Sequence, residues 1–429
     1  MKKKYRIILY TSIFLLCVVA SIILVVKKSN SVYEEESKPK VVKHKSMLSM
    51  NLEQTAGAGD YKTVTQSKWP TEGYKFNAEL SRCENGSTLS WDDTKKAVIV
   101  SGNLSDKCYV YFDIYQPTLA EYIKSQYTGT QGENNIYYHD SDLANGAGDN
   151  SYRYAGANPN NFVCFGTTES PCPTDNLYRI IGVFGENYHG VTGKQLVKLI
   201  KYDYMTTDEL GTDGDYSQTY KEWGMDSTYK GTYGDGERIG VYYWNYKATG
   251  SATNTWSTSL LNKTNLNTNF INNIGTTWAN KIATVTWKVG GNTWANIGTK
   301  TSSVAYTNEI TNPVTTNTTD NATTYSAKIG LMYVSDYGFA ASPDAWTLTM
   351  SSYNNTTATN NNWMYMGLYE WTISRSADNS NGAFSVHFAG FVNYDYVYYG
   401  YGVRASFNLE SSVSYVSGSG SMSDPIVIN

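Results

Sequence analysis

Histidine and cysteine are the side chains most often used to bind metals and to carry out nucleophilic catalysis, and this chain has few of either. Its four histidines are His44, His139, His189 and His387, and they form neither the HExxH nor the His-x-His pattern of zinc sites. The G-x-S-x-G turn of serine hydrolases is absent, although a Ser/His/Asp triad assembled by the fold stays open. We therefore expect no enzymatic activity, no metal and no cofactor.

One acidic stretch, DELGTDGDY at 208–216, contains carboxylates that could supply oxygen ligands to calcium. It lacks the spacing of an EF-hand loop, however, which favours a solvated turn.

The segment FVNYDYVYYGYGVR, residues 391–404, contains five tyrosines among fourteen residues. If 391–399 is one strand, Tyr394, Tyr396 and Tyr398 share one face of it. A buried strand rarely alternates Tyr with Asn and Asp, because buried polar groups need partners, so part of this segment should be exposed. Tyrosine offers rigid, amphipathic contact area, as in antibody paratopes. We predict a ligand-binding face, with a purely structural aromatic ladder as the alternative, formed by Asn393, Tyr394, Asp395, Tyr396, Tyr398, Tyr399 and Tyr401.

Three neighbouring residues are expected to have structural roles. We expect Trp363 and Trp371 in the core. Arg404 is expected to orient the hairpin through a buried ion pair or through backbone carbonyls, with a contact to the ligand as the alternative.

Four of the five cysteines form two pairs that are local in the sequence. An even number of cysteines outside an apolar segment is typical of disulfides in an oxidising compartment. We predict the disulfides Cys83–Cys108 and Cys164–Cys172, while two other connectivities stay open.

The N-terminus predicts a membrane anchor. Residues 7–26 form an uncharged apolar run that contains Cys17, and this run is long enough to span a bilayer as a helix. Lys2, Lys3, Lys4 and Arg6 favour a cytoplasmic N-terminus. We expect an uncleaved signal anchor in the cell membrane, with a single transmembrane helix and an extracellular C-terminal domain.

The charge of the chain argues against nucleic-acid binding. The formal net charge is −4, and there is no basic block beyond the flanks of the apolar run. Charged residues make up only 17% of the chain and aromatic residues 14%, a composition that favours a β-rich or loop-rich extracellular surface.

Changes in composition predict five regions. Residues 1–28 are the signal anchor, 29–70 a polar linker, 71–116 a small antiparallel β module closed by Cys83–Cys108, 117–150 a connector with a short helix, and 151–429 the main domain. Within the main domain we expect strands at 177–184, 194–203, 331–340 and 361–376, a helix at 256–274, and a hairpin at 383–399. In the strand expected at 402–409, Arg404, Ser406 and Asn408 are expected to point outward, and DPIVIN at 424–429 is expected to close the chain as a short strand.

The order NFVCFG, DNLYRIIGVF, SDYGFA, NWMYMGLYEWTISRS, GVRASFNL and SDPIVI resembles the C-type-lectin-like fold in its formylglycine-generating-enzyme-like branch. More narrowly, it resembles membrane-anchored bacterial surface proteins with such a domain at the C-terminus. The resemblance covers about 150–429 and implies an α+β, loop-rich fold. Ala405 stands where the family usually has Pro.

The resemblance also bears on function. Enzymes of this branch depend on cysteines in the C-terminal half, and no cysteine follows Cys172. Some relatives are ligand-binding proteins diversified by retroelements, whose variable positions resemble 377–401 in composition.

We therefore expect a cell-surface recognition or adhesion protein whose partner is an extracellular glycan or protein. The alternatives are an enzyme on the same scaffold without the cysteine chemistry, and a structural protein of the cell envelope.

Overall fold

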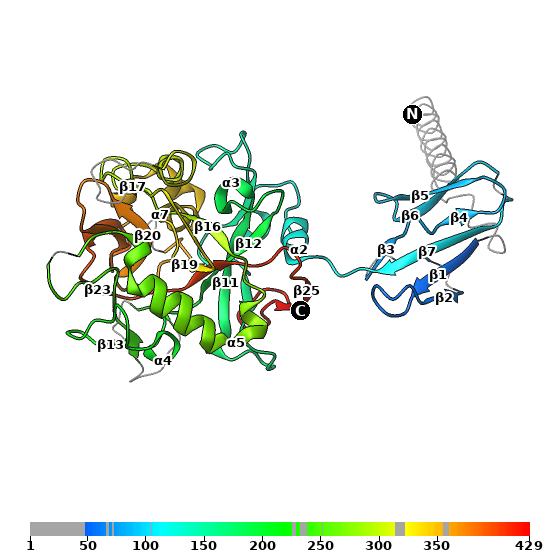
Figure 1. Cartoon of the computed structure of the whole chain (residues 1–429). Coiled ribbons are helices and arrows are strands. Elements are labelled where there is room, and N and C mark those ends of the chain that lie inside the picture. Colours follow the sequence, from blue (N-terminus) through cyan, green and yellow to red (C-terminus); the bar gives the residue numbers. More distant parts are fainter. Residues whose placement is uncertain are drawn as a thin grey trace, which may run out of the picture. The chain divides into compact units, whose positions relative to one another are not determined.

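The computed structural model describes residues 48–65, 68–70, 73–103, 105–224, 229–231, 238–250, 252–313, 322–354 and 360–429. The chain divides into two units, Met1–Gln116 and Pro117–Asn429, and their described residues run from blue to cyan and from cyan to red in Figure 1.

The first unit is built around strand β7 (Cys108–Ile114), which pairs with three other strands. The sheet has the order β2 (Tyr61–Val64), β1 (Leu48–Glu53), β7, β3 (Tyr74–Phe76), with β4 (Arg82–Cys83) also paired to β7. A separate hairpin contains β5 (Thr88–Asp92) and β6 (Ala97–Ser101). We expected a purely antiparallel module, but the pair β1–β7 is parallel.

Residues 48–64, which we expected in the linker, belong to this unit as β1 and β2. Leu48 lies opposite Cys108, so the partner strand is sixty residues further along the chain. Met50 and Leu52 of β1 pack with Val98, Val110 and Phe112 in a small core. The apolar side of β1 therefore forms part of this core. The linker prediction missed this strand because the residues around it are mostly polar.

The second unit contains a seven-stranded sheet in the middle of its fold. Its order is β19 (Ile329–Gly330), β24 (Ser406–Asn408), β12 (Leu196–Lys201), β11 (Leu177–Phe184), β9 (Ser151–Tyr154), β8 (Ile136–His139), with β10 (Phe162–Cys164) on β11. Every residue of β11 and β12 is buried, as the apolar runs at 177–184 and 194–203 predict.

A four-stranded sheet holds the C-terminal hairpin. Its order is β17 (Gly291–Asn292), β20 (Glu370–Ser376), β21 (Gly382–Val386), β22 (Val392–Tyr396). The predicted hairpin is confirmed as β21 and β22, and Figure 1 shows β20 and β17 on one side of the unit, away from β11.

Short strand pairs and helices complete the second unit. The pairs are β13 (Glu222–Gly224) with β14 (Arg238–Gly240), β15 (Tyr242–Tyr243) with β23 (Gly400–Tyr401), β16 (Val285–Lys288) with β18 (Thr324–Ala327), and β25 (Tyr415–Ser417) with β26 (Val427–Ile428). The α-helices are α2 (Leu119–Ser125), α3 (Glu186–His189), α4 (Thr207–Leu210), α5 (Ile271–Ala279), α6 (Ser302–Tyr306) and α7 (Val334–Ala340). The π-helical segments are η5 (Leu261–Phe270) and η6 (Thr307–Thr311), and the 3₁₀ turns are η2 (Glu133–Asn135), η3 (Thr174–Asn176), η4 (Trp256–Thr258), η7 (Pro343–Thr347) and η8 (Met350–Ser352).

Three predictions for the second unit require correction. The strand predicted at 361–376 forms only over β20, Glu370–Ser376. The segment 331–340 contains helix α7 instead of a strand, and Asp336 in its first turn accepts a hydrogen bond from the backbone N–H of Tyr333 at 2.9 Å. In the segment 402–409, Arg404, Ser406 and Asn408 are buried instead of exposed. Arg404 donates to the Glu370 carboxylate, and the Ser406 hydroxyl donates to the carbonyl of Leu199, so both side chains have polar partners inside the unit.

The disulfides Cys83–Cys108 and Cys164–Cys172 are both present, which confirms the predicted pairing. Cys83 and Cys108 lie opposite each other in the antiparallel pair β4–β7.

The predicted fold class and location require correction. The described chain is a mixed, sheet-rich fold, and none of its helices within the described ranges has the length and apolar character needed to cross a membrane. The predicted transmembrane helix falls on residues 7–26, outside the described residues. A single-pass signal anchor, and with it a cell-membrane location, is therefore not supported.

Candidate functional site

Strand β22 places two of the predicted site tyrosines on the molecular surface. It is hydrogen-bonded to β21 with Tyr394 opposite Phe384 and Tyr396 opposite Gly382. Along β22, Tyr394 and Tyr396 are exposed, while Asn393 and Asp395 are only half-exposed. The predicted alternation of exposed and less exposed side chains therefore holds for residues 392–396, and not for the whole of 391–399.

The chain turns after Tyr396 instead of continuing as a strand to residue 399. The backbone N–H of Tyr399 donates to the carbonyl of Tyr396 at 2.8 Å, which closes the turn. Val397 is fully buried, and its N–H donates to the carbonyl of Asn381 at 2.9 Å. This turn brings Tyr398 and Tyr399 to the surface together, whereas a continuous strand would have put them on opposite faces.

Tyr396, Tyr398 and Tyr399 form a group of mutually contacting rings, which we call the tyrosine cluster. The rings of Tyr396 and Tyr398 are parallel within 6°, with centroids 5.1 Å apart. Tyr399 meets both of them edge-on, at 5.7 Å and 5.4 Å. Each of the three side chains is 38–40% exposed. The rings hold one another in place and still present apolar area and hydroxyl groups to solvent.

Tyr394 lies apart from the cluster, against a second aromatic group. Its ring centroid is 6.0 Å from that of Trp294 and 6.4 Å from that of Phe384. Tyr394 is exposed and Trp294 is half-exposed. Because Tyr394 and Tyr396 share the outer face of β22, these rings extend the aromatic surface along the strand.

The other predicted site residues support this surface from below. Asp395 accepts a hydrogen bond from the Ser385 hydroxyl at 2.7 Å, and burial raises the pKa of its carboxyl. The Asn393 amide lies 3.5 Å from Asp395. Tyr401 is buried, and its ring stacks on Tyr369 at 4.6 Å. Of the seven predicted residues, the structure therefore exposes four tyrosines and uses Asp395 and Tyr401 for packing.

Arg404 and the two tryptophans have the structural roles predicted for them. Arg404 is 1% exposed, and its Nε and Nη2 donate to the two carboxylate oxygens of Glu370 at 2.8 Å and 3.0 Å. Nη2 also donates to the carbonyl of Met364. Trp363 and Trp371 are both buried.

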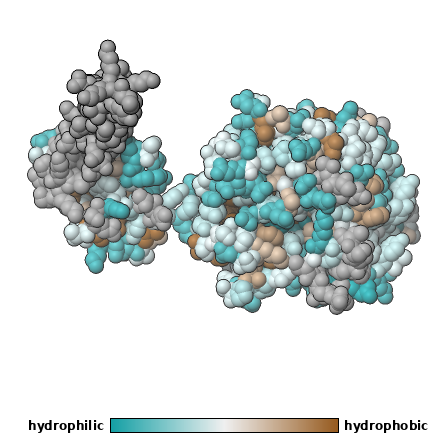
Figure 2. Space-filling model, turned by 180° about the vertical axis from the view of Figure 1, so that it is seen from behind, coloured by the Kyte–Doolittle hydropathy of each residue, from teal (hydrophilic) through white to brown (hydrophobic). Residues whose placement is uncertain are grey.

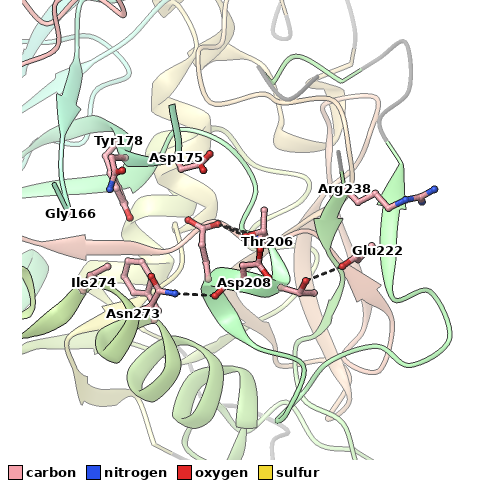
Figure 3. A pocket seen from close by; sticks show the side chains of 13 residues that line it. Gly166, Asp175, Tyr178, Thr206, Asp208, Glu222, Arg238, Asn273 and Ile274 are labelled. Atoms are coloured by element: carbon pink, nitrogen blue, oxygen red, sulfur yellow. Dashed lines mark hydrogen bonds between the residues drawn. The ribbon is translucent and has the colours of Figure 1, made fainter. Parts of the chain in front are cut away.

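A second candidate site is a polar hollow of about 600 Å³ beside helix α4 (Figure 3). It contains the carboxylates of Asp175, Asp208, Glu209 and Glu222 and the guanidinium of Arg238. Glu209 already accepts from Thr206 at 2.9 Å and pairs with Lys201 at 3.0 Å. Glu222 accepts from the Thr207 hydroxyl at 2.9 Å. Two of its four carboxylates are therefore already bonded to other residues of the chain. For this reason the hollow is a weaker candidate than the tyrosine cluster.

The acidic stretch 208–216 caps a helical segment. One carboxylate oxygen of Asp215 accepts from the backbone N–H groups of Leu260 and Leu261, at 2.8 Å and 3.2 Å, where η5 begins. No group of three or more metal-ligating side chains occurs within the described ranges.

We predict that Asp215 makes stability pH-dependent. Burial raises its pKa to about 6, above the ordinary value of 3.8. A raised pKa in the folded state means that the fold binds the proton more tightly than the unfolded chain. The stabilising contribution is therefore complete below about pH 4 and is lost as the pH rises through about 6, by up to about 3 kcal/mol.

The variant Asp215→Asn tests this prediction, because its amide oxygen still accepts from the η5 backbone but does not ionise. Urea unfolding at several pH values should show the variant gaining stability relative to the wild type between pH 4 and pH 6.5. A difference that stays constant over this range would contradict the assignment.

Exposed apolar area does not single out another site. On the face drawn in Figure 2, described hydrophobic residues lie in small groups between hydrophilic ones, as on an ordinary protein surface.

Comparison with family models, with curated proteins and with solved structures found no match. The resemblance to formylglycine-generating-enzyme-like proteins stays a prediction.

Proposed function

We propose that this protein is a ligand-binding protein without catalytic function, and that the tyrosine cluster is the centre of its binding surface. The observation that carries the proposal is that three tyrosine rings, each 38–40% exposed, are fixed by one another on a tight turn. Rings that are already ordered lose little conformational freedom when a ligand packs against them. The ligand we propose is a glycan or the surface of another protein.

The surroundings of the cluster support this proposal. Val397, in the same turn, is fully buried, and the ring of the buried Tyr401 lies 6.3 Å from that of Tyr399. A rigid support of this kind is what keeps a binding surface in one geometry. The two disulfides are typical of proteins that work in an oxidising environment, where such ligands are found.

The triple variant Tyr396→Ser, Tyr398→Ser, Tyr399→Ser tests the proposal. Binding of the whole chain is measured on arrays of glycans and of proteins, and then by titration with the strongest hit. Central aromatic residues of an interface each contribute about 2 kcal/mol, so we expect the affinity to fall by at least about 100-fold.

Tyr220 provides the matched control, since it is the most exposed of the described tyrosines, at 58%, and lies outside the cluster. Tyr220→Ser should leave the affinity unchanged. Circular dichroism confirms that both variants are folded. If the folded triple variant binds the hit as tightly as the wild type does, the cluster is not the binding surface.

A further inference from the structure

A second cavity, of about 380 Å³, lies where strand β11 meets the segment that precedes β20. Its walls combine cations with aromatic rings, and none of the described residues that line it carries a carboxylate. The cations are Arg179 and Lys230, and the rings are those of Phe162, Tyr202, Trp363 and Tyr365. This composition differs from that of the acidic hollow beside α4 and would suit a negatively charged ligand.

Arg179 is held rigidly in the wall of this cavity. Its guanidinium lies between two rings, 4.3 Å from the centroid of Phe162 and 4.6 Å from that of Trp363. Nε donates to the side-chain oxygen of Asn161 at 2.7 Å, and Nη2 donates to the carbonyl of Pro159 at 3.0 Å. Nη1 makes no hydrogen bond to the described residues, which leaves this nitrogen for a ligand.

No carboxylate among the described residues pairs with Arg179, in contrast to three other buried cations of this unit. Arg153, Lys198 and Arg404 each have a carboxylate oxygen within 2.8 Å. Arg179 is only 6% exposed, yet no described residue forms an ion pair with it. Burial lowers its pKa to about 9, so it is still charged at neutral pH. A buried charge of this kind is costly unless something compensates it.

The rest of the cavity provides a second cation and several amides. The ammonium group of Lys230 lies 4.3 Å from the ring centroid of Tyr365. Asn158, Asn160 and Asn360 line the cavity and are exposed, and their side chains form no hydrogen bond to the described residues. Amides can donate to and accept from hydroxyl groups, and ring faces pack on the C–H groups of a sugar.

We propose that this cavity binds a carboxylate-bearing sugar of the hexuronic acid class. The carboxylate would accept hydrogen bonds from Nη1 of Arg179 and from Lys230, the ring would pack on the aromatic wall, and the hydroxyl groups would face the asparagines. This site is separate from the tyrosine cluster, so it can hold whether or not the proposed function is correct.

The test is isothermal titration calorimetry of the whole chain with D-glucuronate, D-galacturonate, D-glucose and sulfate. For a ligand of this size we expect a Kd of about 1 mM for at least one of the two uronates. Glucose, which lacks the carboxylate, should bind at least about tenfold more weakly. Sulfate, which lacks the sugar ring, should also bind more weakly, and a uronate should raise the melting temperature in proportion to its occupancy.

Two variants connect binding to the named residues. Lys230→Gln removes an exposed cation at the cavity and should weaken uronate binding by at least about tenfold, whereas Lys263→Gln, on the exposed side of η5, should leave it unchanged. Arg179→Lys keeps the charge but not the planar donor, and should also weaken binding if its melting temperature shows that it is folded. No binding of either uronate, equal binding of glucose, equal binding of sulfate, or an unaffected Lys230→Gln variant would overturn the proposal.

Discussion

Asp336→Ala is expected to destabilise the second unit by about 3–5 kcal/mol. Asp336 is 1% exposed, and its carboxylate bonds to two buried side chains, Tyr188 of α3 and Lys198 of β12. One carboxylate oxygen accepts from the Tyr188 hydroxyl at 2.6 Å, and the other accepts from the ammonium of Lys198 at 2.7 Å. The guanidinium of Arg153 lies 3.8 Å away.

The size of this effect follows from what the substitution leaves behind. Lys198 is fully buried, and burial already lowers its pKa against the opposing effect of Asp336. Without the carboxylate, Lys198 must either keep an unpaired charge in the core or lose its proton, and both cost free energy. The first turn of α7 also loses the hydrogen bond from the Tyr333 backbone.

Denaturant unfolding followed by tryptophan fluorescence measures this effect. Asp142→Ala is the matched control, since Asp142 is exposed and its carboxylate has no partner among the described residues, so we expect a change within about 0.5 kcal/mol. A loss below 1 kcal/mol for Asp336→Ala would show that the buried network contributes little to stability.

The paired substitution Cys83→Ala, Cys108→Ala is expected to unfold the first unit. The disulfide closes a loop of 25 residues, which is worth about 3 kcal/mol. Among the described residues of the unit, the core cluster contains only five buried apolar side chains, so we expect little stability in reserve. The second unit has its own core and should stay folded.

Amide hydrogen exchange measured along the whole chain distinguishes the two units. Protection should disappear from β1 and β7 and persist in β11 and β12. The control is Cys164→Ala, Cys172→Ala, which opens a loop of 8 residues beside a much larger core and should preserve protection in both units. Protection that persists in β7 after the first substitution would contradict this account.

Local patterns predicted the elements whose neighbours are near in sequence. The apolar run of β11, the hairpin β21–β22 and both disulfides depend on residues within about thirty positions of each other. Strand β1 is an exception: its antiparallel partner β2 is near in the sequence, but the polar composition around both strands predicted a linker, and its parallel partner β7 is sixty residues away. Parallel pairing of this kind leaves no turn signal in the sequence.

The errors near the C-terminus have a different cause. Alternating apolar residues at 331–340 fit a strand or a short buried helix equally well, and the buried contacts of Asp336 decide for the helix. The polar residues of β24 were expected outside because polar residues usually are. Two of the three buried polar residues at 404–408 have clear partners: Arg404, just before β24, pairs with Glu370, and the Ser406 hydroxyl donates to the carbonyl of Leu199 at 2.8 Å.

The candidate sites show the same division. Composition alone identified the tyrosine segment, but only the turn at Val397 shows that Tyr398 and Tyr399 join Tyr396 in one cluster. The cavity at Arg179 had no signal in the sequence. Its walls come from residues as distant as Phe162 and Met422, and an arginine in an apolar strand does not reveal whether a carboxylate pairs with it.

The most direct test of the tyrosine cluster is ligand protection of individual tyrosines against iodination. The whole chain is labelled with and without a saturating amount of the strongest array hit, and the modified positions are quantified by mass spectrometry. We predict that labelling of Tyr396, Tyr398 and Tyr399 slows at least about tenfold while labelling of Tyr220 is unchanged. If bound ligand leaves the labelling rates of Tyr396, Tyr398 and Tyr399 unchanged, as it does that of Tyr220, the account is contradicted.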